Sequence, residues 1–333
     1  MTRKRVTVVG AGRMGVIHAR NVVVHPDLVL HCVADVRAEA AGAAAEPYGV
    51  SHTADIAAAI DDSAVDAVII ASSTDTHVDL IVRAARAGKG ILCEKPIDLD
   101  LGRVDTCLAE VAKTDVPLQI GFNRRFDPNF AALRQRMRGG DIGTIELVKI
   151  TSRDPHPPPL EYIAVSGGLF RDMMIHDFDM ARWLLGDEPV SVHATASCLV
   201  DPAIAQAGDV DTAVVTMRTA KGVICTIENS RRAVYGYDQR IEVLGSQGML
   251  QAGNPLPTTV TRSSADALST DTLLDFFVER YQAAYRAELD HFARVLVGDT
   301  GPDASAQDGR CALVLAEAAL SSLRSQKTVE VEW

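Results

Sequence analysis

A glycine-rich turn near the start of the chain constrains the fold more than any other feature of the sequence. Gly10, Gly12 and Gly15 form a G-x-G-x-x-G pattern, with Arg13 and Met14 before the last glycine. The pattern follows a valine-rich run and precedes a stretch with helical periodicity. In such a unit the first glycine permits a tight turn, the second admits a pyrophosphate, and the third lets the helix pack closely on the strand. The pattern predicts a βαβ unit that binds a dinucleotide.

A carboxylate after the next apolar run indicates which dinucleotide binds. Asp35 lies 20 residues after Gly15. There it can accept hydrogen bonds from the adenosine ribose hydroxyls, and it would repel a 2′-phosphate. We therefore expect NAD rather than NADP, although the positive charge of Arg37 would favour the 2′-phosphate of NADP. The alternative interpretation is a structural glycine turn followed by an ordinary aspartate at a strand end.

Apolar runs alternate with helical segments through the first third of the chain, which is the pattern of a doubly wound parallel sheet in an α/β fold. We therefore predict an N-terminal Rossmann domain over residues 1–121. Its expected strands are Val6–Val9, Val29–Ala34, Ala67–Ala71, Gly90–Cys93 and Leu118–Gly121. Its expected helices include Met14–Val22, Ala38–Ala45 and Thr76–Ala87.

The pattern changes after residue 121, where β-rich runs are separated by Gly, Pro and Asp and helical connectors are few. This predicts an α+β domain over residues 122–333 with an open, mostly antiparallel sheet. The last helix has one apolar face and is expected to pack back on the N-terminal domain. The expected strands are Leu147–Ser152, Val190–Leu199, Thr212–Arg218, Val223–Arg231 and Gln239–Leu244. Helices are expected at Phe130–Met137, Gly168–Leu185, Asp275–Leu296 and Asp308–Ser325, and loops at Asp154–Pro159 and Ala252–Asp271.

Charge and composition exclude several classes of protein. The 333-residue chain has a net charge of -11, whereas a duplex nucleic-acid binder needs a basic stripe. No apolar run approaches the roughly 20 residues of a membrane helix, and the first apolar stretch is too short for a signal peptide. The six cysteines are scattered, without a CxxC pair. We expect a cytoplasmic protein with reduced cysteines, no metal and a small-molecule partner.

A lysine follows the fourth expected strand, in the segment Glu94-Lys95-Pro96. This is the carboxyl edge at which open α/β sheets bind ligands. The ammonium of Lys95 can hydrogen-bond a reacting hydroxyl and favour its alkoxide-like form as hydride leaves for the nicotinamide. The alternative interpretation is a solvated surface lysine, because lysine is usually exposed.

Asp172 and His176 are four residues apart, so on one helix they lie on the same face and reach the same small ligand. A histidine with its pKa near neutrality can accept a hydroxyl proton, and a carboxylate can orient it. The alternative is a buried histidine with a local aspartate partner. Zinc is a weaker interpretation because no third Cys or His ligand clusters with the pair. A Ser-His-Asp hydrolase is disfavoured because no G-x-S-x-G elbow is present.

Beyond these motifs, nearly the whole chain resembles the Gfo/Idh/MocA family, which includes glucose-fructose oxidoreductase, inositol dehydrogenase and rhizopine catabolism proteins. Two segments are typical of the whole family, and the middle ones resemble inositol 2-dehydrogenases. The family-wide segments are the GAGRMG turn and EKP. The others are QIGFNRRFDPNF at 119–130, SGGLFRDMMIHDFDMARWLLG at 166–186, NSRRAVYGYDQRIEVLGS at 229–246, FFVERYQAAYRAEL at 276–289 and DGRCALVLAEAA at 308–319.

The resemblance implies that Lys95, Asp172 and His176 form the catalytic set. His176 is then the general base, and Lys95 and Asp172 position the reacting and adjacent hydroxyls. The implied reaction is NAD-dependent oxidation of a ring hydroxyl of an inositol, from myo-inositol to its 2-keto form, usually in a homotetramer built through the second sheet. The alternatives are another cyclic polyol or pyranose, such as scyllo-inositol or an aldose, and a non-catalytic NAD-sensing protein.

Four residues from the more specific segments are candidates for binding ring hydroxyls. They are Arg124, Asp154, His156 and Tyr235. For each of them a loop or interface role is the alternative, since loops serve both purposes.

The loop after the third expected strand normally flanks the cofactor in this family. Here it departs from the family pattern, because many members carry Thr-Pro where this chain has Thr74-Asp75. The expected cofactor contacts outside the glycine turn, Asp35 and Arg37 are Ser72, Thr74, His77, Glu94 and Lys95.

Overall fold

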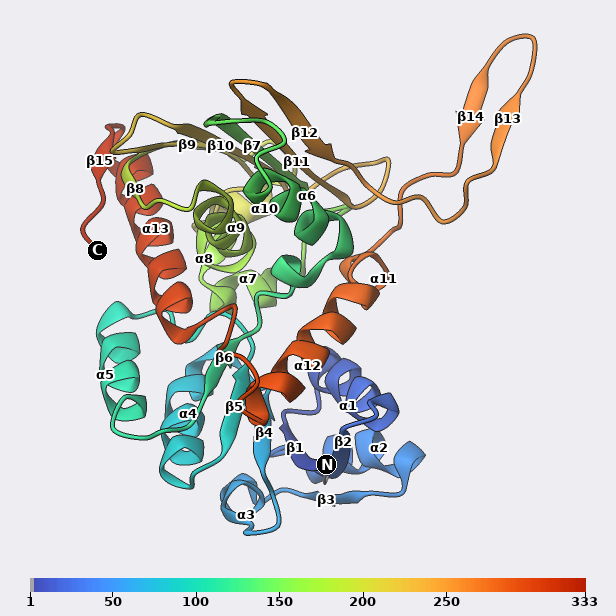
Figure 1. Cartoon of the computed structure of the whole chain (residues 1–333), viewed down its shortest axis with the longest axis vertical. Coiled ribbons are helices and arrows are strands. Elements are labelled where there is room, and N and C mark those ends of the chain that lie inside the picture. Colours follow the sequence, from blue (N-terminus) through green and yellow to red (C-terminus); the bar gives the residue numbers. More distant parts are fainter. Residues whose placement is uncertain (1–2) are drawn as a thin grey trace. The chain divides into compact units, whose positions relative to one another are not determined.

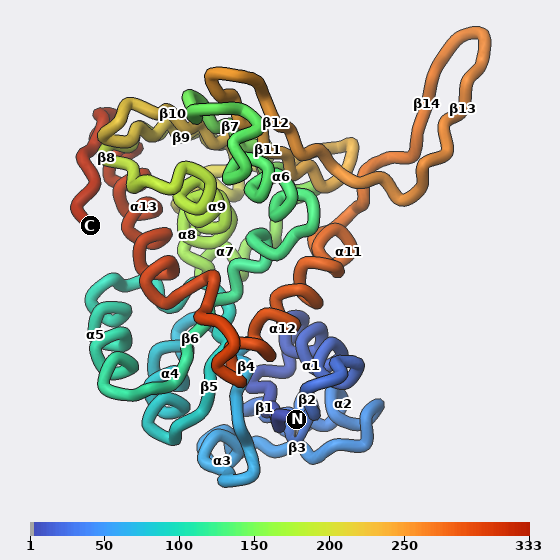
Figure 2. The backbone as a smooth tube through the Cα atoms, viewed as in Figure 1, coloured from blue at the N-terminus to red at the C-terminus, as the bar shows by residue number. Residues whose placement is uncertain are grey.

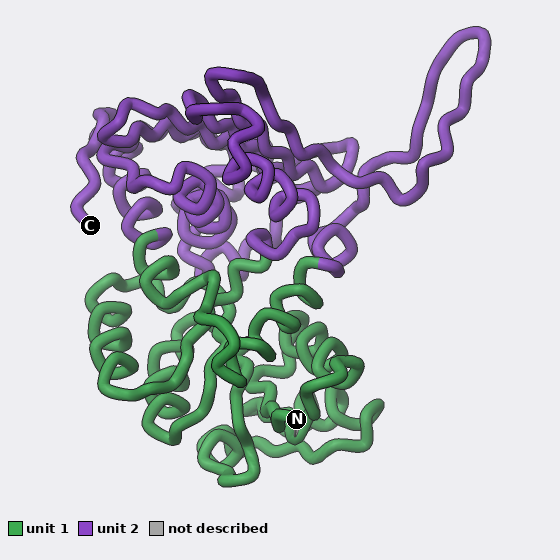
Figure 3. The backbone as a smooth tube through the Cα atoms, viewed as in Figure 1, with its two compact units in different colours: residues 1–123, 284–311 green, residues 124–283, 312–333 purple. Residues whose placement is uncertain are grey.

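The computed structural model describes residues 3–333, and these form two compact units (Figures 1 and 3). The first unit runs to Asn123 and also contains Ala284–Cys311, while the second contains Arg124–Ala283 and Ala312–Trp333. The sequence predicts one boundary after residue 121 and the return of the last helix, but it does not predict that the segment before that helix also joins the first unit. That segment joins the first unit because its Leu289, Phe292 and Ala293 are buried in the same apolar core as the first strands.

The first unit is built on a six-stranded parallel sheet in the order β3-β2-β1-β4-β5-β6. Every residue of β4 and β5 is buried, as expected of strands covered on both faces. The predicted Rossmann sheet is confirmed; β3 was not predicted because its three residues are polar and mostly exposed. The strands are β1 Lys4–Val9, β2 Leu28–Ala34, β3 Ser51–Thr53, β4 Ala67–Ile70, β5 Gly90–Cys93 and β6 Leu118–Ile120.

Helices cover both faces of this sheet, and side chains cap two of them. Asp55 accepts a hydrogen bond from the amide of Ala58, and Asp100 accepts one from the amide of Arg103. Such caps satisfy amides that the first turn of a helix leaves without partners. The helices are α1 Arg13–Val24, α2 Ala38–Ala45, α3 Ile56–Asp61, α4 His77–Arg86, α5 Leu101–Val111 and most of α12, Gln282–Leu296.

The second unit contains a seven-stranded sheet in the order β12-β11-β7-β10-β9-β8-β15. Only the pair β7 and β10 is parallel, which confirms the prediction of a mostly antiparallel sheet. Buried and exposed residues alternate along β9, so one face is packed and the other is open. The strands are β7 Ile145–Arg153, β8 Pro189–Ser197, β9 Thr212–Thr219, β10 Ile224–Ser230, β11 Asp238–Gly245, β12 Gly248–Ala252 and β15 Val329–Glu330.

Helices of the second unit lie along the packed face of this sheet (Figure 2). Val148 and Ile150 of β7 are buried, and Ser322 accepts a hydrogen bond from the amide of Ala194. The last helix is shared, since only its start up to Cys311 belongs to the first unit. The helices are α6 Pro128–Arg138, α7 Leu160–Ser166, α8 Gly168–Asp172, α9 Ile175–Leu185, α10 Pro202–Gln206, α11 Phe277–Arg280 and α13 Ala306–Ser325.

The prediction of one continuous helix over Gly168–Leu185 is wrong. The amides of Met173 and Met174 both donate to the carbonyl of Leu169, so the regular hydrogen-bond ladder ends there. Helix α8 therefore ends at Asp172, and α9 begins at Ile175. Both methionines are buried, and neither glycine nor proline marks the break in the sequence.

The prediction of a structureless loop over Ala252–Asp271 is also wrong. This segment contains a two-stranded hairpin, β13 Thr261–Ser263 and β14 Leu268–Thr270, all of whose strand residues are exposed (Figure 1). Similarly, the expected helix over Asp275–Leu296 is interrupted at Tyr281 between α11 and α12.

Candidate active site

The glycine turn has the geometry that each of its glycines requires. Gly10 has φ +96°, and a Cβ there would lie 2.5 Å from the carbonyl oxygen of Ala71. A Cβ on Gly15 would lie 1.7 Å from the carbonyl oxygen of Gly10, so only glycine permits this approach of α1. A Cβ on Gly12, in contrast, would meet no atom within 4 Å. Protein backbone therefore packs against the turn at Gly10 and Gly15, whereas the turn is open at Gly12, where a ligand can approach.

The open side of the turn is the N-terminus of α1. Gly12 caps this 12-residue helix, and no side chain accepts from its first amides. Arg13 is exposed and Met14 is half-buried beside it. Unpaired amides and the positive end of the helix dipole bind phosphate oxygens well. The turn therefore fits the pyrophosphate of a dinucleotide.

Asp35 lies just beyond the carboxyl end of β2 and braces the same turn. Its Oδ2 accepts from the amide of Ala11 at 2.7 Å, and its Oδ1 accepts from the amide of Arg37 at 2.9 Å. Burial acts to raise the carboxyl pKa, but these amides and the Arg37 guanidinium outweigh it and hold the pKa of Asp35 below its usual value. Asp35 is therefore ionised at neutral pH, as recognition of ribose hydroxyls requires.

His77 connects the loop after β4 to the segment after β5. Its Nδ1 lies 2.8 Å from the carbonyl oxygen of Pro96, and its Nε2 lies 3.2 Å from that of Ser72. The ring is 1% exposed, and burial lowers the pKa of His77. The Ser72 hydroxyl also lies 2.7 Å from that of Thr76, and Thr74 is half-buried in the same short 3-10 helix. His77 therefore holds the predicted cofactor loop through its contacts inside the unit.

Glu94 and Lys95 follow β5 at the same edge of the sheet. Oε1 of Glu94 lies 2.7 Å from Nε2 of buried His18, on α1. A Cβ on Gly121 would lie 2.9 Å from Oε2 of Glu94, so the backbone just after β6 packs closely against this carboxylate. The Glu94 side chain is thus directed into the unit, whereas Lys95 remains partly exposed.

Asp172 and His176 lie on either side of the break between α8 and α9. Asp172 is the last residue of α8 and accepts a hydrogen bond from the Tyr162 hydroxyl at 2.9 Å. His176 is the second residue of α9, and both side chains are partly exposed. The prediction that a single continuous helix presents this pair is therefore wrong, although both residues remain beside the same turn.

The structure brings Asp154 into the electrostatic environment of Asp172. Burial raises the pKa of Asp154 to about 6; Asp172 adds repulsion, and the guanidinium groups of Arg231 and Arg124 oppose the rise. A carboxyl group with such a pKa in a cluster of charges is a feature typical of functional sites. Three of the predicted site residues, Asp154, Asp172 and Arg124, therefore share one neighbourhood in the second unit.

Arg124 is buried and makes contacts within the protein. It donates to Oδ1 of Asp177 at 2.5 Å and to the Ser152 hydroxyl at 3.2 Å. Oδ2 of Asp177 accepts from the Asn229 amide at 2.9 Å, so both oxygens of the carboxylate are paired. Removal of either partner of a buried ion pair is strongly destabilising, because the other charge is left buried without compensation. The pair anchors α9 one residue after His176.

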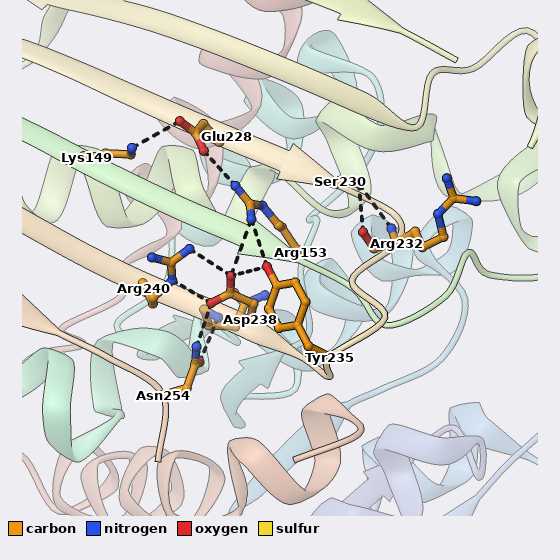
Figure 4. Close-up of polar contacts among 10 residues, drawn as sticks. Lys149, Arg153, Glu228, Ser230, Arg232, Tyr235, Asp238, Arg240 and Asn254 are labelled. Atoms are coloured by element: carbon orange, nitrogen blue, oxygen red, sulfur yellow. Dashed lines mark hydrogen bonds and ion pairs between the residues drawn. The ribbon is translucent and has the colours of Figure 1, made fainter. Parts of the chain in front are cut away.

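Tyr235 and His156 make different contacts. The Tyr235 hydroxyl donates to Asp238 at 2.8 Å and accepts from Arg153 at 2.8 Å, in an ion-pair network along the open face of the sheet (Figure 4). His156 is exposed, and its ring stacks on that of Phe276 at 6.1 Å.

Three residues of this neighbourhood were not singled out by sequence reasoning. Tyr162 binds Asp172, Asp177 pairs with Arg124, and Arg231 is 1% exposed and lies near Asp154 and Asp209. Asp177 and Arg231 lie inside the segments 166–186 and 229–246, which resemble inositol 2-dehydrogenases, and this resemblance could have identified them. Tyr162 follows three consecutive prolines and carries no comparable signal.

Residues 3–333 contain no group of three His, Cys, Asp or Glu side chains arranged to hold a metal ion. Over the same range no helix combines the length and apolarity needed to cross a bilayer. The six cysteines all lie within residues 3–333, and none of them forms a disulfide there.

Two family domains match the chain. Residues 4–122 match the oxidoreductase family domain described as an NAD-binding Rossmann fold, and residues 130–251 match the GFO/IDH/MocA C-terminal domain.

Several relatives match over nearly the full length. The inositol 2-dehydrogenase of Rhizobium meliloti strain 1021 is 50% identical, over 98% of this chain and 99% of that one. The myo-inositol 2-dehydrogenase of Thermotoga maritima is 47% identical, over 98% of each chain. The crystal structure of scyllo-inositol dehydrogenase from Lactobacillus casei, with NAD(H) and scyllo-inositol bound, superposes with a TM-score of 0.91 at 28% identity, covering 99% of both chains.

The glycine geometry predicts opposite effects of the same substitution at two positions. Gly12→Ala adds a methyl group to the open side, so the fold is retained and the Kd for NAD rises by about tenfold or more. Gly15→Ala places a methyl group against the Gly10 carbonyl and lowers the free energy of unfolding by about 3 kcal/mol or more. Calorimetric NAD titration and urea unfolding measure the two effects; equal loss of stability in both variants contradicts this account.

Asp35→Ala is expected to weaken NAD binding by about tenfold or more, since charge-assisted hydrogen bonds to the ribose are lost. NADP binding should weaken less, because the repulsion of its 2′-phosphate is lost too. Titration calorimetry with both nucleotides measures the change, and Glu39→Ala, which removes an exposed carboxylate from α2, is the control. Equal effects on the two nucleotides rule out ribose recognition by Asp35.

Proposed function

Because the chain belongs to the GFO/IDH/MocA oxidoreductase family, we propose that it catalyses the NAD-dependent oxidation of one ring hydroxyl of an inositol, from myo-inositol to its 2-keto form. The observation that carries the proposal is near-full-length identity of 50% and 47% to two inositol dehydrogenases. The glycine turn, Asp35, Lys95, Asp172 and His176 are the residues that the reaction needs.

The cofactor is held by the first unit. The amides around Gly12 receive the pyrophosphate, and Asp35 receives the adenosine ribose. Arg13, Met14, Arg37 and the loop from Ser72 to His77 line the remainder of this site. When bound, the nicotinamide supplies the hydride acceptor.

The proton of the reacting hydroxyl passes to the imidazole of His176 as the hydrogen on the same carbon leaves as hydride. The ammonium of Lys95 donates a hydrogen bond to the reacting oxygen, where negative charge develops. Asp172, oriented by Tyr162, accepts from a neighbouring hydroxyl.

Further polyol contacts are assigned to residues of the second unit. Asp154 accepts from a ring hydroxyl, since its neighbourhood includes Asp172. Arg124 helps to position α9 through its ion pair with Asp177. It donates to the polyol ring through an N–H group that is not used for Asp177 or Ser152. His156 and Tyr235 are assigned as contacts from the rim, because both are exposed.

A second candidate is a dehydrogenase of another cyclic polyol or pyranose. The structural match to a scyllo-inositol dehydrogenase favours it, because few residues select among hydroxyl stereoisomers. A non-catalytic NAD-sensing protein is disfavoured by the presence of the complete Lys95, Asp172 and His176 set.

We also propose a homotetramer assembled through the open face of the second sheet. Four apolar side chains form one register row across this face, and three of them are 40% exposed or more. The exposed hairpin adds apolar Val260 and Leu268, and two-stranded hairpins are marginally stable when isolated. Apolar patches of this kind mark interfaces. The row consists of Ile224, Leu147, Leu244 and Met249.

The remaining assignments follow from charge and chemistry. The net charge of -11 disfavours nucleic acid as a partner and leaves a small polyol as the ligand. We assign the protein to the cytoplasm, where NAD is available and thiols remain reduced, and to polyol catabolism.

A substrate panel tests the function. The purified protein with NAD is expected to produce NADH absorbance with myo-inositol, at a higher kcat/KM than with scyllo-inositol or glucose. Preference for scyllo-inositol or an aldose selects the second candidate. The absence of turnover with every inositol overturns the proposal.

Variants of the two proposed chemical groups test the mechanism. Lys95→Ala and His176→Ala are each expected to lower kcat by about 100-fold or more while the Kd for NAD changes little. Exposed Lys113→Ala and His193→Ala are matched controls, one in each unit. Unchanged turnover in either active-site variant removes the role assigned to that residue.

A further inference from the structure

The first unit contains a group of buried polar side chains behind the segment that carries Lys95. They come from four elements that meet there, and we call them the buried polar cluster. Its members are His18 and Asn21 of α1, Glu94 after β5, Gln119 of β6 and Glu288 of α12.

Glu288 is the central member of the cluster. Its side chain is 0% exposed, and neither carboxyl oxygen has a hydrogen-bond partner among residues 3–333. Burial, with added repulsion from Glu94, raises the pKa of Glu288 well above its usual value. An isolated carboxylate in such surroundings is very costly, whereas a protonated carboxyl group is tolerated.

Glu94 connects this group to the active-site edge of the sheet. Its Oε1 lies 2.7 Å from Nε2 of His18, and the ring of His18 meets the edge of the Tyr285 ring at 6.1 Å. Tyr285 and Glu288 are three residues apart on α12 and so share one face of that helix. One face of α12 therefore carries Tyr285, which contacts His18, and Glu288, which lies near Glu94, the partner of His18.

Other members have polar atoms without partners within the described residues. These are Nδ1 of His18, Oε1 of Gln119 and both amide atoms of Asn21. Gln119 is also joined to α12, since its Nε2 lies 3.4 Å from the Glu288 carbonyl oxygen. Buried polar atoms in native proteins are almost always hydrogen-bonded, and internal water serves groups that side chains do not reach.

We propose that Glu288 is a positioning residue, whose protonated carboxyl group acts through internal water to hold Glu94 and His18, and thereby the backbone from which Lys95 projects. Glu94 and Lys95 are adjacent, so displacement of the Glu94 side chain moves the Lys95 backbone. His18 lies one turn beyond Gly15, so the same group also supports the helix that follows the glycine turn. The proposal rests on the function proposed above only for the role of Lys95.

The protonation state is tested without activity. Infrared difference spectra of the full protein with NAD, in H2O and D2O at neutral pH, are expected to show the C=O stretch of a protonated carboxyl group. The band should disappear in Glu288→Gln. It should remain in Asp290→Asn, which changes an exposed carboxylate on the same helix that pairs with His25 at 3.1 Å. A band that survives Glu288→Gln, or no band in the wild type, overturns the proposal.

The positioning role is tested by comparing two substitutions of similar size. Glu288→Leu removes every polar contact and is expected to lower kcat by about tenfold or more, with the Kd for NAD changed by less than about threefold. Glu288→Gln keeps a neutral polar group and should rescue kcat to within about twofold of the wild type. A glutamine variant as impaired as the leucine variant, or a fully active leucine variant, overturns the role.

The two proposals fail in distinguishable ways. If the wild type turns over no inositol, the proposed function fails while the infrared band still tests the protonation of Glu288. If the wild type is active but the band is missing, only the inference about Glu288 fails. If Glu288→Leu does not fold, the kcat of Glu288→Gln and the infrared spectra still test the role of Glu288.

Discussion

The close approach of α1 to the turn after β1 is the contact on which the first unit depends. A single methyl group on Gly15 would overlap the carbonyl of Gly10, so the helix sits where only glycine permits. That approach puts the open side of Gly12 at the helix N-terminus, with Asp35 bonded to the amide of Ala11 beside it. Packing and ligand binding in this unit are therefore consequences of the same backbone geometry.

The second unit contains charged residues in its interior, and they are held there as ion pairs. Arg124 pairs with Asp177, and Arg125 pairs with Asp179 at 2.8 Å, so two neighbouring arginines hold α9 through two of its aspartates. Each pair is buried, and removing one partner would leave the other charge uncompensated. These pairs hold the start of α9, where His176 lies, while the break at Met173 and Met174 separates it from Asp172.

Buried parallel strands were the easiest elements to predict, because their sequences are continuous apolar runs. β5 was predicted to the residue for this reason, whereas polar β3 gave no such signal. The hairpin of β13 and β14 was missed because it is exposed on all sides and lacks apolar alternation. In the candidate site, motif spacing identified the glycine turn and Asp35, but not Tyr162, whose hydroxyl reaches Asp172 only after the chain has folded.

Local sequence was enough to predict the glycine turn, the buried strands around it and the titratable groups of the site, because these depend on local backbone freedom and on hydrophobic period. Tertiary structure decided where those groups point. Glu94, His77 and Arg124 are predicted ligand contacts, and the structure shows that each also bonds to residues from distant parts of its own unit. The reason is that a buried charge or imidazole must find a partner, and only the folded chain determines which partner is within reach.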